Sequence, residues 1–304
     1  MRLFPLPCCA SMCGTLPAER PVFIADLHLS RDEPALTEAL VDFLENVAPD
    51  YGELFVLGDC FDAWIGDDEI DRWPELITAF NRLHATGTRI YFMQGNRDFI
   101  MGRDAPRTLG GTLIADPTVI VHDKRRILLS HGDAWCTGDE DYQKVRRRVR
   151  RAWWQGMMLS LPRFVRLKVA RDARAKSKAA KKNKARSAPS VMDVAVPAVA
   201  EAVERHDADL VVHGHTHRPT LHPPGEGLPV TRIVVPDWRV MPDGRVSAGY
   251  VHIDRVPVLE TFTHVPAAKT AANAASIDKA DAKGTPATGT KAASPTATTR
   301  EVVA

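Results

Sequence analysis

The chain of 304 residues has few cysteines, no long apolar run and almost no net charge. Its five cysteines are an odd number without regular spacing, which excludes a disulfide-stabilised secreted scaffold and favours a reducing compartment. No apolar run reaches the roughly 20 residues that span a bilayer, which excludes a transmembrane helix. Prolines interrupt residues 1–19, where a signal peptide needs about 7–15 continuous apolar residues. We therefore expect a cytoplasmic protein.

Neither end of the chain has a pattern of apolar residues that predicts an element of a folded core. Residues 1–20 are broken by prolines, and residues 265–304 consist largely of Ala, Thr, Lys and Ser. The low-complexity tail cannot bury enough apolar surface to form a core. The sequence therefore predicts a flexible leader over 1–20, a folded domain over 21–264 and a disordered tail over 265–304.

The folded domain repeats one pattern, in which an apolar run is followed directly by metal-binding side chain types. The runs cover residues 21–25, 54–57, 89–93, 126–129 and 208–212, and the side chains that follow them are Asp26 and His28, Asp59, Asn96, His131, and His215 and His217. Helical patterns over 36–47 and 73–85 separate the first three runs. The pattern predicts an α/β sheet with its ligands at the carboxyl ends of the strands.

These imidazole, carboxylate and amide groups suit two transition metal ions. A mixed set of nitrogen and oxygen ligands favours manganese, iron or zinc over magnesium or calcium. Only two of the ligands are anionic, so two divalent ions keep roughly +2 of charge and attract an anionic substrate. Arg97, next to Asn96, offers a planar guanidinium that suits phosphate oxygens. Two such ions can hold a phosphate during in-line displacement, so we predict phosphoryl hydrolysis.

Taken singly, several of these residues have plainer interpretations. Paired histidines such as His215 and His217 are common without a metal, and Asn96 alone is typical of a turn. Asp62, three residues after Asp59, is either a partner of a ligand or a helix cap. The metal hypothesis therefore depends on the same pattern following five separate strands.

The composition changes between residues 144 and 186. This stretch has seventeen Lys or Arg residues and one acid, Asp172, a net charge of +16, whereas the whole chain carries +2. Trp153, Trp154 and several Met and Leu residues lie among the cations. A solvated helix face is the plainer interpretation, but basic residues mixed with large apolar ones also match a surface that contacts anionic lipid or nucleic acid. We favour a binding surface because the stretch is long and carries large apolar side chains.

Five short motifs occur in the order Asp-x-His, Gly-Asp, Gly-Asn-Arg-Asp, His-Gly and Gly-His-x-His. In this order they resemble those of the calcineurin-like metallophosphoesterases. The resemblance covers about residues 22–263 and implies an α/β fold, a β-sandwich flanked by helices, with a dinuclear Mn²⁺ centre. One Mn²⁺ would be held by Asp26, His28, Asp59 and His217, and the other by Asp59, Asn96, His131 and His215.

The finer motifs resemble the branch of this family that acts on UDP-2,3-diacylglucosamine in lipid A biosynthesis. They include residues 63–68, Cys136-Thr137 and Met192-Asp193-Val194. The resemblance implies hydrolysis at the α-phosphorus to UMP and 2,3-diacylglucosamine 1-phosphate. It also implies a helical cap over about 134–188 that takes the acyl chains and touches the cytoplasmic face of the inner membrane. The substrate contacts that it implies are Asn96, Arg97, Asp139, Ser177, Lys184 and His215.

The cap departs from the pattern of this branch. The branch carries Ser, Asn and Lys spaced by four and then three residues, whereas here Lys181 stands between Ser177 and Lys184 where Asn is expected. Two other hypotheses remain: a phosphoesterase acting on nucleotides or RNA, and a non-catalytic scaffold that binds nucleic acid. The apolar residues of the cap favour the lipid substrate over the nuclease, and the complete ligand set argues against a scaffold, so we expect no nucleic acid partner.

Overall fold

The computed structural model describes residues 15–187, 193–225, 227–266 and 296–299, with the side chains of 176–187 and 296–299 outside the description. The strands are β1 (Leu16–Pro17), β2 (Pro21–Ile24), β3 (Glu53–Leu57), β4 (Arg89–Met93), β5 (Thr112–Ile114), β6 (Thr118–His122), β7 (Arg125–Ser130), β8 (Leu210–His213), β9 (Thr220–His222), β10 (Thr231–Val234), β11 (Arg239–Val240), β12 (Val246–Ile253), β13 (Pro257–His264) and β14 (Thr296–Thr299). The α-helices are α1 (Pro34–Asn46), α2 (Pro74–Ala85), α3 (Asp104–Thr108), α4 (Glu140–Val149), α5 (Ala152–Ser160), α6 (Arg163–Ser187) and α7 (Val196–His206). Short 3₁₀ turns are η1 (Ala48–Asp50), η2 (Asp67–Arg72) and η3 (Asp133–Trp135).

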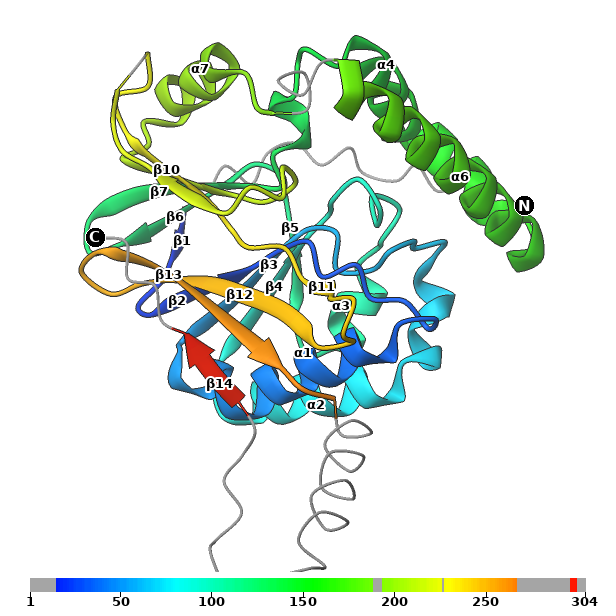
Figure 1. The fold of residues 1–304 in the computed structure, drawn as a ribbon, viewed down its shortest axis with the longest axis horizontal. Coiled ribbons are helices and arrows are strands. Elements are labelled where there is room, and N and C mark those ends of the chain that lie inside the picture. The colour runs from blue at the N-terminus through cyan, green and yellow to red at the C-terminus, as the bar shows by residue number, and fades with distance from the viewer. Residues whose placement is uncertain (1–14, 188–192, 226, 267–295, 300–304) are drawn as a thin grey trace, which may run out of the picture.

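The described strands form two sheets that pack face to face. One sheet has the order β1-β6-β7-β8-β10-β9, and the other has the order β14-β13-β12-β2-β3-β4-β5, with β11 paired to β12. Helices α1 and α2 cover the outer face of the second sheet, and α7 covers the outer face of the first (Figure 1). The expected sandwich flanked by helices is therefore confirmed.

Three apolar layers hold these elements together. Along β3, Leu54 and Val56 face α1 and α2, whereas Phe55 and Leu57 pack between the two sheets. Along β7, Leu128 packs under α7 while its neighbours in the strand face the other sheet. Strands that are buried on both faces have continuous apolar sequences, which explains why these strands could be predicted from the sequence.

The parallel strands bring their carboxyl ends to one edge of the sandwich. Strands β2, β3 and β4 are parallel neighbours in one sheet, and β7 and β8 are parallel neighbours in the other. Each of these five strands is followed by one of the predicted ligand clusters. Strands β6 and β7 form an antiparallel hairpin, with Asp123 and Lys124 at its turn in the left-handed conformation.

Two short strands depart from the predicted domain limits. Residues 15–20 belong to the predicted leader, but β1 pairs with β6 and Ala18 is buried between the sheets. Residues 296–299 belong to the predicted tail, but they form β14 and pair with β13. Strands of two and four residues have no periodicity that a sequence pattern can reveal, because their partners in the sheet stabilise them. The remaining leader and tail residues lie outside the described ranges.

Helices α4, α5 and α6 form the cap, and α4 and α6 project to one side of the sandwich (Figure 1). Arginines of α6 attach it to residues 62–69 of the core. Arg166 makes a bidentate pair with Asp68 and also donates to the carbonyl of Ile65. Arg163 pairs with Glu69 in the same way. Among the described residues, no helix is both long enough and apolar enough to cross a membrane.

Candidate metal centre

All seven predicted ligands meet at the edge where the two sheets end. Five of them adopt left-handed backbone conformations, with φ between 49° and 69°: Asp26, His28, Asp59, His215 and His217. Such conformations cost about 1–3 kcal/mol each outside glycine and persist only where the surrounding structure fixes them. The chain therefore turns sharply at each strand end to aim these side chains at one point.

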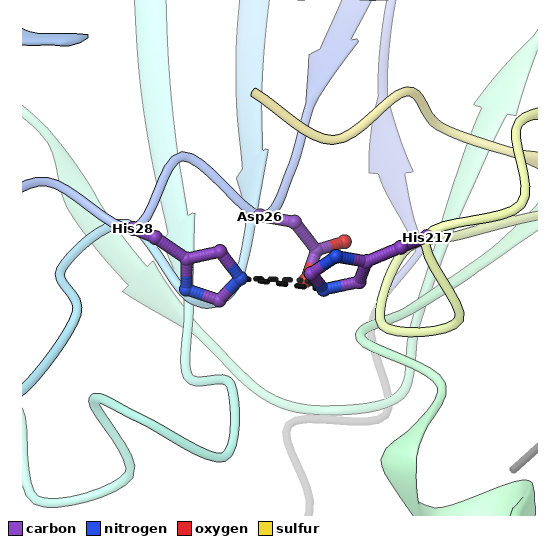
Figure 2. A group of neighbouring side chains, drawn as sticks. All are labelled: Asp26, His28 and His217. Carbon is purple, nitrogen blue, oxygen red and sulfur yellow. Dashed lines mark hydrogen bonds and ion pairs between the residues drawn. The ribbon is translucent and has the colours of Figure 1, made fainter. Parts of the chain in front are cut away.

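One group of ligands consists of Asp26, His28 and His217, which point toward one another (Figure 2). The Nε2 atoms of the two imidazoles lie 3.3 Å apart, and His217 Nε2 lies 3.4 Å from Asp26 Oδ1. Asp26 Oδ1 is buried and accepts no hydrogen bond within the described part of the chain. A buried carboxylate oxygen costs free energy unless something pairs with it, and a divalent cation fits this position.

A second group surrounds Asn96. Its Oδ1 lies 3.0 Å from His131 Nε2 and 2.8 Å from His215 Nδ1. Asp59 lies between the two groups, with Oδ1 3.6 Å from His131 Nε2 and Oδ2 3.9 Å from His28 Nδ1. Asp26 also reaches Asp59 and His131 closely enough for one ion. Both carboxylates are therefore placed where they can serve two cations.

Burial and charge act strongly on the ionisation of these ligands. Burial raises the pKa of Asp59 to about 7, and the charge of His131 opposes this shift only in part. Burial would also raise the pKa of Asp26, but His217, His131 and His28 outweigh it and hold that pKa well below its usual range. Burial opposes charge on His217, yet the neighbouring carboxylates of Asp237 and Asp26 raise its pKa to about 10. The carboxylates thus draw positive charge into a buried site, as a cation site requires.

Glycines let the ligand loops approach one another. A Cβ on Gly214 would lie 2.6 Å from Asp26 Oδ2, and a Cβ on Gly95 would lie 2.2 Å from Asp59 Oδ1. Real Cβ atoms do not tolerate such distances, so any larger residue at either position must displace a ligand carboxylate. These glycines belong to the motifs that the sequence analysis singled out.

Asp98 fixes two of the ligand loops and was not among the predicted site residues. Its buried carboxylate accepts backbone hydrogen bonds from Gly95 (2.6 Å), Asp59 (3.3 Å) and Cys60 (2.8 Å). It therefore joins the loop after β3 to the loop after β4. Its place in the Gly-Asn-Arg-Asp motif was the one signal in the sequence.

A cavity of about 420 Å³ opens beside the first ligand group. Its charged and imidazole lining includes His28, Asp62, Arg97, Arg174, His217 and Arg239. Arg97 donates its backbone N–H to Asp59 Oδ1 (2.7 Å), and its Nε is buried without a hydrogen bond partner in the described residues. Asp62 pairs with Arg174 of α6, so it links the core to the cap.

Asp133 lies in the short turn η3 and joins helix α4, the first helix of the cap, to the site. It was not among the residues predicted from the sequence. Its buried carboxylate accepts from the hydroxyl of Tyr142 (2.5 Å) and from Arg146 Nε (2.8 Å). Arg150 lies 3.5 Å from the same oxygen and donates to the carbonyl of Gly95 (3.0 Å). The Tyr142 ring also stacks on a metal-site imidazole, His215. Helix α4 is therefore fixed against the loops of the second ligand group, which carry Asn96, His131 and His215.

The predicted substrate contacts of the cap, Asp139 among them, stay predictions. Asp139 caps α4 by accepting from the backbone N–H of Tyr142 at 3.0 Å. The side chains of Ser177, Lys181 and Lys184 lie outside the described residues, so the roles of Ser177 and Lys184 stay predictions. His122, which has no ligand type beside it, hydrogen-bonds to the carbonyls of Ala18 and Asp254 and is structural.

Comparison with known proteins agrees with this geometry. The model of the family described as calcineurin-like phosphoesterase matches residues 20–219. A protein from Chromohalobacter salexigens named UDP-2,3-diacylglucosamine hydrolase is 42% identical over 79% of this chain and 96% of its own length. Proteins of the same name from Haemophilus influenzae and Escherichia coli are 43% and 40% identical, each over 71% of this chain and 90% of their own.

The chain belongs to the calcineurin-like phosphoesterase family and is a hydrolase. The resemblance that its motifs indicate, including that of the finer motifs, is confirmed by these relatives. The family implies divalent metal ions, and the ligand groups around Asp26 and Asp59 fit them.

Proposed function

We propose that the protein hydrolyses UDP-2,3-diacylglucosamine at the α-phosphorus and releases UMP and 2,3-diacylglucosamine 1-phosphate, a step of lipid A biosynthesis. The observation that carries this proposal is the convergence of seven ligand side chains beside a cavity that Arg97 lines. The relatives' printed name supports the choice of substrate, because they match this chain over most of their length.

The ligand geometry supports a pair of Mn²⁺ ions. In our assignment, Asp26, His28, Asp59 and His217 would hold one ion, and Asp59, Asn96, His131 and His215 would hold the other. When bound, such ions supply an activated water and neutralise charge on the phosphate oxygens. The mixed imidazole, carboxylate and amide donors favour Mn²⁺ over Mg²⁺.

The chain's own side chains bind and orient the substrate. Arg97 lines the cavity, and its Nε lies 3.9 Å from Asp59 Oδ2 without a hydrogen bond, so its guanidinium is placed to bind the diphosphate. Asn96 and His215 contact each other at 2.8 Å and would border the same phosphate. Asp139, Ser177 and Lys184 are assigned to the part of the substrate under the cap.

The cap supplies an apolar surface for the acyl chains and for the cytoplasmic face of the inner membrane. Its exposed apolar side chains include Trp153 (56% exposed), Phe164 (74%) and Met157 (47%). Cations of α4 and α6 lie among them, which is the composition that binds anionic lipid surfaces. Flotation with anionic vesicles tests this surface: Trp153→Glu with Phe164→Glu should reduce binding, whereas Val256→Glu, at an exposed apolar residue outside the cap, should not.

Turnover of the lipid nucleotide by metal-stripped protein tests the function. Addition of Mn²⁺ should restore UMP release from UDP-2,3-diacylglucosamine. Mn²⁺-dependent cleavage of a generic phosphodiester without turnover of the lipid nucleotide would keep the metal centre and reject the substrate. Full activity in the presence of a chelator would reject the metal mechanism.

A further inference from the structure

Two imidazoles of the metal centre are held from behind, but by different groups. His131 directs Nε2 toward Asn96 and Asp59, while its Nδ1 lies 3.0 Å from the backbone carbonyl of Leu57. His217 directs Nε2 toward Asp26 and His28, while its Nδ1 lies 3.5 Å from Asp237 Oδ2. The nitrogen that faces away from the ligand group has an oxygen partner in both cases.

Asp237 is held firmly in this place. It lies in the segment after β10, where the backbone N–H of Val235 donates to His213 (2.8 Å) and that of Trp238 donates to Asp26 (3.1 Å). The indole Nε1 of Trp238 donates to the carbonyl of Gly249 at 2.9 Å. Asp237 itself is 8% exposed, and Arg239, the cation that it meets at 4.0 Å, lies on the surface. The segment that carries Asp237 is thus tied to two ligand loops.

We propose that Asp237 is a positioning residue for the metal centre. Its carboxylate accepts a hydrogen bond from Nδ1 of His217 and keeps Nε2 of that ring free and aimed at the metal ion of the first ligand group. The proposal rests on the two-metal site proposed above. A carboxylate behind a metal-binding imidazole fixes the tautomer and the ring orientation and makes the imidazole a stronger donor to the metal. A backbone carbonyl behind His131 fixes its ring without adding charge.

Asp237 lies outside the five sequence motifs that carry the metal ligands. It lies beyond residues 20–219, which the family model matches, and twenty residues after His217 in the sequence. The strand pair β8 and β10 brings it back, because their parallel register sets Val234 beside His213. The fold therefore supplies a partner that the motif order does not contain.

Metal binding to purified, metal-stripped protein tests the proposal. Calorimetric titration with Mn²⁺ should give two equivalents for the wild type. Asp237→Ala should weaken one of the two by about 10–100-fold and leave the other within about threefold. Asp237→Asn, whose amide oxygen still accepts a hydrogen bond, should recover most of that loss.

Asp254→Asn is the matched control, because Asp254 lies 3.7 Å from His252 Nδ1 in a carboxylate–histidine pair outside the metal centre. It should bind both equivalents as the wild type does. Thermal unfolding of the metal-free variants separates a folding defect from a selective loss of one ion. Two wild-type affinities in a folded Asp237→Ala protein would overturn the role of Asp237, whereas a wild type that binds no metal would overturn the proposed function instead.

Discussion

The metal centre and the cap both concentrate charge, but the fold holds them in different ways. Asp26 and His131 are fully buried, and their loops are fixed by backbone hydrogen bonds and by left-handed turns. The cap instead lies outside the sandwich, where arginines such as Arg166 attach it, and it exposes Phe164 at 74%. We therefore expect kcat to depend steeply on small displacements of the metal-binding side chains. Substitutions in the cap should mainly change substrate binding.

The largest effect is expected from removing a ligand. Asp59→Ala or His131→Ala should reduce kcat by at least about 1,000-fold because each removes a donor from the metal centre. Both proteins should stay folded, as judged by circular dichroism. His206→Ala, on α7 away from the site, is the control and should keep wild-type turnover. Substantial turnover by either ligand variant would contradict the two-metal assignment.

Adding one methyl group in each region compares them directly. Gly214→Ala places its Cβ 2.6 Å from Asp26 Oδ2, so we expect a loss of about 100-fold in activity, together with weaker Mn²⁺ binding. Gly156→Ala in cap helix α5 meets nothing within 4 Å and should stabilise the helix by about 0.5–1 kcal/mol. Equal activity of the two variants would remove the contrast between core and cap.

Loosening the cap should change substrate binding more than chemistry. Arg166→Ala removes the bidentate pair with Asp68 and the contact with the carbonyl of Ile65. We expect KM to rise roughly 3–10-fold with kcat nearly unchanged, and Arg166→Lys to restore little because it cannot make the bidentate pair. Steady-state kinetics check this, and a fall in kcat with constant KM would place Arg166 in the catalytic step instead.

Metal binding should tighten as pH rises. The pKa of His217 is raised to about 10 from an ordinary 6.5, so the ring must lose a proton before Nε2 can bind an ion. The apparent Mn²⁺ affinity should rise with pH between 6.5 and 9.5, by up to about tenfold per unit.

The raised pKa of His217 has the opposite effect on the stability of the metal-free protein, which should fall as the pH rises. A pKa raised on folding stabilises the chain fully below pH 6.5, and this stabilisation is lost as pH rises toward 10. In a chelator, the midpoint temperature of thermal unfolding should fall from pH 6.5 to pH 8 and again to pH 9.5 because of His217. Mn²⁺ affinity that is flat across the same range would contradict both expectations.

The smallest effect is expected from removing residues 267–304. Strand β14 pairs with the edge strand β13, far from the metal ligands, so its loss should lower stability slightly. Turnover should stay within about twofold of the wild type. A large loss of turnover would show that the tail acts on the site.

The sequence predicted the core of the metal centre because its ligands follow continuous apolar strands. Parallel strands in two packed sheets end at one edge, so the side chains after β2, β3, β4, β7 and β8 had to meet. The left-handed conformations of these ligands could not be predicted from the sequence, because Asp and His do not by themselves specify a positive φ. They arise from the packing of neighbouring loops, such as Gly95 against Asp59.

The supporting carboxylates were missed for a related reason. Asp98 acts through backbone N–H groups, Asp133 through Arg146, which lies thirteen residues further on, and Asp237 through an imidazole twenty residues before it. The local spacing of residues does not predict these supporting carboxylates, because strand pairing and helix packing bring them to the site. The short strand β1 escaped prediction in the same way, since its partner β6 lies about a hundred residues away.

The most direct test of the account is hydrolysis of UDP-2,3-diacylglucosamine in ¹⁸O-labelled water by metal-stripped protein titrated with Mn²⁺. We predict no turnover without metal, a rate that reaches its plateau at two equivalents per chain, and the label in UMP, because attack is at the α-phosphorus. Turnover in the presence of a chelator, or label in the lipid phosphate, would contradict the account.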